Sequence, residues 1–254
     1  MKLHSQIFGQ GSPLIIMHGV FGMGDNWKTL ARRWAEHYQV HVLDMRNHGR
    51  SPHSEAFSYE VMSDDVREYL ADHDLSSVHL LGHSMGGKVG MLFACLHPEH
   101  TRSLIVADIG PQSYRPHHDQ VVSALKGLDL SQVSSRRDAQ EQFGPDLPQG
   151  VRQFLLKNLY WEDKETLGWR FNLPVLARSV GEETAGLPPQ AQYDGPVLFV
   201  RGGRSDYLPD ESLPQLHEHF PQAQVKTLPE AGHWLHAEQP QPFFELVMDF
   251  LSGQ

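Results

Sequence analysis

The chain has 254 residues, of which 39% are hydrophobic and 20% are charged, so it can fold as one domain and is not a disordered chain. Lys and Arg total 21 against 31 Asp and Glu, which gives a formal net charge of −10. Because this charge repels phosphate backbones and anionic lipid, neither nucleic acid nor a membrane is an expected partner. A single cysteine, Cys95, excludes an internal disulfide and a cysteine-rich zinc site.

The first residues lack the apolar segment and cleavage site of a secretory signal. No window reaches the ~18 apolar residues that a membrane-spanning helix needs. A cytoplasmic protein is therefore the expectation.

Short apolar runs alternate along the chain with longer amphipathic segments. The runs predict strands at residues 14–17, 40–43, 78–81, 104–107, 197–200 and 225–228. The amphipathic segments predict helices near residues 27–34, 59–70, 85–97 and 242–251. Strands that alternate with helices indicate an α/β fold, with a mostly parallel sheet flanked by helices.

The interval of residues 112–193 interrupts this alternation, because it holds helical patterns and no good buried strand. Ligands of open α/β sheets bind beyond the carboxyl ends of the strands, so an insertion there could cover the site. We expect a helical lid at 112–193, inserted between two late strands of a core formed by residues 1–111 and 194–254. A small structural domain without a role in binding is the alternative.

A G-x-S-x-G sequence, Gly82-His83-Ser84-Met85-Gly86, follows the third predicted strand and opens a helix. In this setting the motif predicts a nucleophile elbow, a turn so tight that bulky side chains two residues before or after the serine would collide with their neighbours. The helix would direct its positive end toward Ser84 and favour a developing oxyanion. A glycine-rich helix start with a capping serine is the structural alternative.

A serine nucleophile needs a base and an acid that orients the base, and in this type of fold they follow in the order Ser, acid, His. His233 is the predicted base because it comes directly after the last strand, whereas His236 is expected to be structural. Two carboxylates compete for the role of acid. Asp206 follows the fifth predicted strand and is favoured, and Asp108 follows the fourth and is the alternative.

Two backbone N–H groups are required to stabilise the oxyanion. One is expected at Met85, and the other at Val20 in the loop after the first strand, with Phe21 as the fallback. His18, at the start of that loop, is interpreted as a buried hydrogen-bonding residue. Residues 44–51, after the second strand, are interpreted as scaffold.

The histidine-rich stretches 117–119 and 217–219 look like metal ligands at first sight. Neither has the spacing of a zinc-binding helix or a second cluster to complete a site, so both are expected to be exposed surface. The sequence thus predicts no metal and no cofactor.

Together these motifs resemble the YbfF-type esterases of the α/β-hydrolase superfamily. The resemblance covers nearly the whole chain and is weakest between residues 112 and 150; it rests on HGVFG at 18–22, DNW at 25–27, DMRNHGRSP at 44–52, GHSMGGK at 82–88, DI at 108–109, WRFNL at 169–173 and GHWLHAE at 232–238. It implies a cytoplasmic bacterial enzyme without cofactor that hydrolyses short- to medium-chain acyl esters, with acyl-CoA thioesters and simple aryl esters as further substrates. Some relatives lack an acid at the position of Asp206 and rely on that of Asp108, so the resemblance leaves both open.

We therefore predict a serine carboxylic ester hydrolase that forms an acyl-enzyme on Ser84 and acts on a small molecule. Dehalogenases and epoxide hydrolases use an Asp nucleophile, so Ser84 at this position argues against both classes. A C–C bond hydrolase, a lyase or a cofactor-free haloperoxidase would use the same residues. A non-catalytic, ligand-sensing relative is the alternative from a different functional class.

Overall fold

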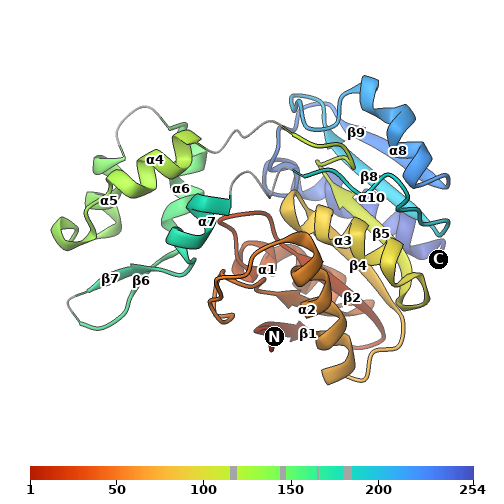
Figure 1. The fold of residues 1–254 in the computed structure, drawn as a ribbon, viewed down its shortest axis with the longest axis horizontal. Coiled ribbons are helices and arrows are strands. Elements are labelled where there is room, and N and C mark those ends of the chain that lie inside the picture. The colour runs from red at the N-terminus through yellow and green to blue at the C-terminus, as the bar shows by residue number, and fades with distance from the viewer. Residues whose placement is uncertain (115–118, 144–146, 165, 180–184) are drawn as a thin grey trace.

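The computed structural model describes the chain except residues 115–118, 144–146, 165 and 180–184. Its centre is a seven-stranded sheet in the order β1-β3-β2-β4-β5-β8-β9 (Figure 1). β1 pairs antiparallel with β3, and the other neighbouring strands pair in parallel. The strands are β1 (Ser5–Phe8), β2 (Ser12–Met17), β3 (Tyr38–Leu43), β4 (Val78–His83), β5 (Thr101–Ala107), β8 (Val197–Gly202) and β9 (Ala223–Leu228). The predicted α/β fold with a mostly parallel sheet is confirmed.

Helices cover both faces of this sheet, because successive side chains of a strand point to opposite faces. Ile15 and Met17 of β2 belong to a core shared with α2, α3 and α8, whereas Leu14 and Ile16 belong to a second core shared with α1 and α10. These helices are α1 (Lys28–Trp34), α2 (Tyr59–Asp72), α3 (Met85–Leu96), α8 (Leu213–His219) and α10 (Pro240–Ser252). Because both faces of the sheet are buried, the strands and their carboxyl ends are held in fixed positions relative to one another.

Between β5 and β8 the chain leaves the sheet and forms a group of elements that we call the cap. Figure 1 shows the cap to one side of the core. Its elements are α4 (Asp119–Gly127), α5 (Arg136–Gln142), α6 (Gln149–Leu156), β6 (Leu159–Trp161), β7 (Leu167–Trp169) and α7 (Leu173–Ser179). The expected helices are present, but β6 and β7 add an antiparallel hairpin that the sequence analysis did not predict. The boundaries at 112 and 193, and the role of the cap as a lid, remain predictions.

Within the described part of the chain, no helix is long and apolar enough to cross a membrane. The same residues contain no group of three or more His, Cys, Asp or Glu that could hold a metal ion. Of the two histidine-rich stretches, residues 117 and 118 lie outside the described ranges. The expectation that 217–219 is exposed is wrong for His219, which is buried and donates from Nδ1 to the carbonyl of Ala191 at 2.6 Å.

The turn between β4 and α3 leaves no space for side chains at two of its positions. Ser84 adopts φ 52° and ψ −118°, a conformation that side chains rarely accept. A Cβ atom on Gly82 would lie 2.1 Å from the carbonyl oxygen of Gly86, and one on Gly86 would lie 2.4 Å from the carbonyl oxygen of Met17. Both glycines are thus required, for the steric reason that the sequence motif predicts.

We expect Gly86→Ala to lower the free energy of unfolding by about 3 kcal/mol, because the added methyl group must push α3 away from β2. Chemical denaturation measures this change. Gly127→Ala is the matched control, since a Cβ atom there meets nothing within 4 Å. Equal stability of the two variants would contradict the steric argument.

Candidate active site

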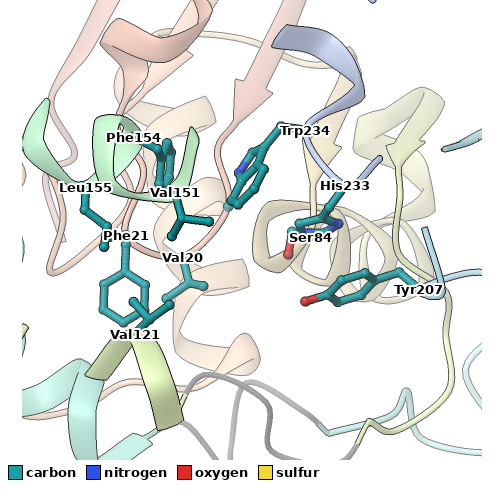
Figure 2. Close-up of a pocket in the computed structure, with 11 residues that line it drawn as sticks. Val20, Phe21, Ser84, Val121, Val151, Phe154, Leu155, Tyr207, His233 and Trp234 are labelled. Atoms are coloured by element: carbon teal, nitrogen blue, oxygen red, sulfur yellow. The ribbon is translucent and has the colours of Figure 1, made fainter. Parts of the chain in front are cut away.

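Ser84 faces a cavity of about 230 Å³ where the cap meets the core. Figure 2 shows Ser84 and His233 beside each other, with Tyr207 next to them. The remaining walls are mostly apolar, and they are Gly19, Val20, Phe21, Val121, Val151, Phe154, Leu155 and Trp234. Val121 lies on α4 and three other wall residues lie on α6, so the cap supplies a large part of the wall.

The imidazole of His233 is held by a buried carboxylate. Its Nδ1 lies 2.8 Å from Oδ2 of Asp108, whose side chain is completely buried directly after β5. A carboxylate can only accept, so Nδ1 of His233 carries the hydrogen and donates it. This leaves Nε2 without a proton in the neutral ring, which is the state that a general base requires.

The structure places Asp108, not Asp206, against His233, and this corrects the sequence-based preference. Asp206 is exposed, whereas the preceding Ser205 turns inward and its hydroxyl donates to Oδ2 of Asp108. The N–H of Gly202, at the end of β8, donates to Oδ1 of Asp108 at 2.8 Å. The segment after β8 therefore supplies hydrogen bonds to a carboxylate on the neighbouring strand.

Three groups around His233 were not singled out in the sequence. The ring of Tyr207 stacks on the imidazole with centroids 3.9 Å apart, and Nε2 of His83 donates to the carbonyl of His233 at 2.9 Å. Ser205 is the third group: its hydroxyl donates to Oδ2 of Asp108, the same oxygen that accepts from His233. Each of the three is close in sequence to a predicted site residue, but that position does not show which way a side chain turns.

His236 is a structural residue, as predicted. It is buried and stacks on Trp27 with ring centroids 4.2 Å apart. Burial lowers the pKa of His236 to about 3, so its imidazole is neutral across the physiological range.

The two N–H groups predicted in the loop after β2, those of Val20 and Phe21, differ in whether a hydrogen-bond partner is present. The N–H of Phe21 donates to Nε2 of His48 at 3.1 Å, so the fallback donor is already engaged. The N–H groups of Val20 and Met85 donate to no acceptor within the described part of the chain. Val20 and Met85 are therefore the pair that fits the predicted oxyanion site.

Two buried, neutral histidines hold this loop through hydrogen bonds. Nε2 of His18 accepts from the N–H of Met45 at 3.0 Å, which agrees with its predicted role as a hydrogen-bonding residue. Burial lowers the pKa of both His18 and His48, so each acts as a fixed neutral donor and acceptor. Asp44 accepts from two backbone N–H groups and holds the neighbouring loop, as expected for scaffold.

One cap residue binds the same loop directly. The side chain of Asn158 is completely buried, and its Nδ2 donates to the carbonyl of Phe21 at 2.8 Å. Phe21 adopts φ 58°, a backbone conformation that costs energy for a residue with a large side chain. Its ring packs edge-on against the ring of Phe171 in the cap, with centroids 5.3 Å apart. The cap thus helps to hold the strained residue that follows Val20.

Comparison with known proteins places this arrangement in a family. The family described as alpha/beta hydrolase fold matches residues 12–165. The chain is 34% identical over 243 residues to esterase YbfF of Escherichia coli strain K12, which covers 95% of this chain and 93% of that protein. The chain belongs to the α/β hydrolases, among the YbfF-type esterases.

Other relatives of this α/β hydrolase agree with an activity on esters. It is 38% identical over 249 residues to a Mus musculus protein named sn-1-specific diacylglycerol lipase, with 94% of this chain and 80% of that protein covered. The solved structure of a marine microorganism esterase matches with a TM-score of 0.95 and 37% identity, over 98% of this chain and 99% of that one. The protein is therefore an ester hydrolase.

We expect Asn158→Ala to reduce kcat for ester hydrolysis about tenfold with little change in KM, because one lost hydrogen bond of ~1.4 kcal/mol loosens the loop that carries the Val20 N–H. Steady-state kinetics on a soluble aryl ester measure both constants. Asn172→Ala is the control. The Nδ2 of Asn172 donates to Oδ1 of Asn47 at 3.1 Å, so this substitution removes a different hydrogen bond between cap and core. An equal loss in both variants would indicate a general loosening of the cap.

Proposed function

We propose that this ester hydrolase is a serine carboxylic ester hydrolase, which acts on short- to medium-chain acyl esters and on acyl-CoA thioesters through an acyl-enzyme on Ser84. The observation that carries the proposal is the 2.8 Å contact between Nδ1 of His233 and the buried Asp108, in the cavity that Ser84 also lines. Asp108 then takes the place of the acid in a Ser-His-Asp triad.

Acylation begins when Nε2 of His233 accepts the hydroxyl proton of Ser84 while Oγ forms a bond to the acyl carbon. The electron pair of the carbonyl moves to its oxygen, where the N–H groups of Val20 and Met85 donate hydrogen bonds. Loss of one such donor typically costs ~3–4 kcal/mol. The imidazolium of His233 then gives its proton to the leaving oxygen or sulfur, the bond to that atom breaks, and the acyl group stays on Ser84.

Deacylation repeats these steps with water. Nε2 of His233 takes a proton from the water molecule as its oxygen attacks the acyl carbon, and the same two N–H groups stabilise the second oxyanion. The proton then returns to Oγ of Ser84 as the carboxylic acid departs. Throughout, the hydrogen bond from Nδ1 to Asp108 stabilises the positive charge that forms on the ring.

The dimensions and lining of the cavity support the choice of acyl group. Its volume of about 230 Å³ is smaller than the ~300 Å³ that begins the usual range for drug-sized ligands. Val121 and Val151 of the cap and Val20 of the core offer apolar surface to a short hydrocarbon chain. Because cap residues complete this wall, we propose that the cap acts as a lid whose packing limits chain length.

We expect a fluorophosphonate probe to label the wild-type protein on Ser84, and Ser84→Ala to lose both labelling and nearly all hydrolysis of p-nitrophenyl butyrate. Mass spectrometry of the labelled peptide identifies the site. Circular dichroism of the variant checks that it is folded. Wild-type protein that is folded but remains unlabelled would contradict the acyl-enzyme.

We expect Asp108→Asn to reduce kcat on the order of 10⁴-fold, because an amide no longer selects the tautomer of His233 with a free Nε2. Asp206→Asn is the matched control at the competing position and should stay within about twofold of wild type, since an exposed surface substitution has little effect. Single-turnover and steady-state rates on the same aryl ester compare the two variants. The opposite order of effects would restore Asp206 as the acid.

A further inference from the structure

The two chain segments that join the cap to the core meet at one backbone carbonyl. The entry segment lies between β5 and α4 and contains Pro111, and the return segment follows α7 and contains Leu187. The N–H of Leu187 donates to the carbonyl of Pro111 at 2.9 Å. A Cβ atom on Gly186 would lie 3.0 Å from a backbone nitrogen of the entry segment, so the two segments are in close contact. We call residues 110–114 and 186–187 the cap junction.

A buried lysine of the core binds this junction. Lys88 lies on α3, shortly after Ser84 in the sequence, and is only 1% exposed. Its Nζ donates to the carbonyl of Gln112 at 2.5 Å and to that of Pro111 at 3.2 Å. The ammonium also lies 5.1 Å from the ring centre of Tyr114. One side chain of the helix that follows the nucleophile therefore binds the entry segment at the carbonyl that the return segment also binds.

The environment of Lys88 makes the strength of this contact depend on its proton. Lysine is almost never fully buried unless it is paired with an opposite charge. Within the described part of the chain, the hydrogen-bond partners of Nζ are neutral carbonyls, and burial lowers the pKa of Lys88 to about 7. An ammonium group donates stronger hydrogen bonds than a neutral amine does. The contact between Lys88 and the cap junction therefore weakens as the pH rises through neutrality.

Other titratable groups near α3 are held in one state or engaged elsewhere. Burial raises the pKa of Tyr114, so the hydroxyl next to Lys88 stays protonated at neutral pH. Asp108 acts on Tyr114 electrostatically, but its oxygens accept from the β8 segment and from the catalytic imidazole. On the elements that pack against α3, Asp65 of α2 is in a buried ion pair, and burial lowers the pKa of His79 on β4 to about 4.

The entry segment connects the junction to the catalytic cavity. Nε2 of Gln112 and the hydroxyl of Tyr114 donate to the carbonyl of Tyr207, at 3.1 Å and 2.6 Å. The ring of Tyr207 stacks on His233, and Figure 2 shows the two side chains beside each other. Further along the chain, Val121 of α4 lines the cavity. The position of the entry segment thus affects both a cap wall of the cavity and the surroundings of the base.

We propose that Lys88 is a positioning residue that anchors the cap on the core, and that loss of its proton loosens the cap walls and changes the selectivity for acyl chains. With the proton in place, two charge-assisted hydrogen bonds hold the entry segment, and the cap walls contact a longer acyl chain. Without the proton this contact is weaker, and the preference for the longer chain declines. The inference rests on the proposed acyl transfer to Ser84 and on the proposed role of the cap as a lid.

The test compares p-nitrophenyl hexanoate with p-nitrophenyl acetate, because only the longer acyl chain reaches from Ser84 to the cap walls. Both esters use the same base, so titration of His233 cancels in the ratio of their kcat/KM values. At about pH 6 we expect Lys88→Met to lower the hexanoate-to-acetate ratio about fivefold, mainly through KM for hexanoate, since methionine keeps an apolar stem but forms neither hydrogen bond. As the pH rises to about 8.5, the wild-type ratio should fall toward that of the variant, whose own ratio should stay constant.

Arg178→Met is the matched control, because it removes a different cation that joins cap and core. Arg178 of α7 pairs with Glu55, but both side chains are more than half exposed, so this ion pair contributes little. Its ratio and the pH dependence of that ratio should equal those of wild type. Hydrogen exchange gives a second readout that needs no turnover. At one pH near 6, the amide of Leu187 should exchange about fivefold faster in Lys88→Met and at the wild-type rate in Arg178→Met.

Failure of the anchor and failure of the proposed function give different results. An unchanged ratio in Lys88→Met, a wild-type ratio that is constant across the pH range, or an equal change in Arg178→Met overturns the anchor while the esterase remains. If Lys88→Met does not fold, Lys88→Gln and the wild-type pH series decide by the same criteria. If Ser84 is not labelled and neither ester is hydrolysed, the proposed function fails, and exchange of the Leu187 amide still decides whether Lys88 anchors the cap.

Discussion

The hydrogen bond between His233 and Asp108 is the constraint on which the rest of the site depends. A completely buried carboxylate requires compensation, and Asp108 finds it in donors from two other segments: Gly202 at the end of β8 with Ser205 just after it, and His233 after β9. These donors meet only if the parallel strands keep their register. The N–H of Asp108 itself donates to the carbonyl of Val200 at 2.8 Å, so the acid is part of that register.

Backbone strain is concentrated around the same point. Phe21, Ser84 and Asp108 follow three neighbouring strands, and their φ angles are 58°, 52° and 52°. Conformations of this kind cost about 1–3 kcal/mol each and persist where surrounding contacts determine them. Here those contacts come from His48 and Asn158 at Phe21, from tightly packed glycines at Ser84, and from the β8 loop at Asp108. Contacts from both the core and the cap therefore keep these strained residues in place.

The sequence predicted most of the core because periodic burial and glycine requirements are local properties. The six apolar runs became strands, and the turn around Ser84 could be predicted from two glycines with a steric reason. β1 was missed because four residues with partial burial give little periodicity. The acid was assigned to Asp206 because it and Asp108 both follow strands at one edge, and only the path of the chain after β8 turns Ser205 inward and leaves Asp206 exposed. Asn158 and Tyr207 were missed because their contacts join segments far apart in the sequence.

The apolar cavity around Ser84 affects an ester and its hydrolysis product differently. Apolar walls around Ser84 favour an uncharged acyl ester, but hydrolysis turns that group into a carboxylate, which is unfavourable among apolar side chains. The net charge of −10 adds a repulsive field at long range, so both effects favour release of the product.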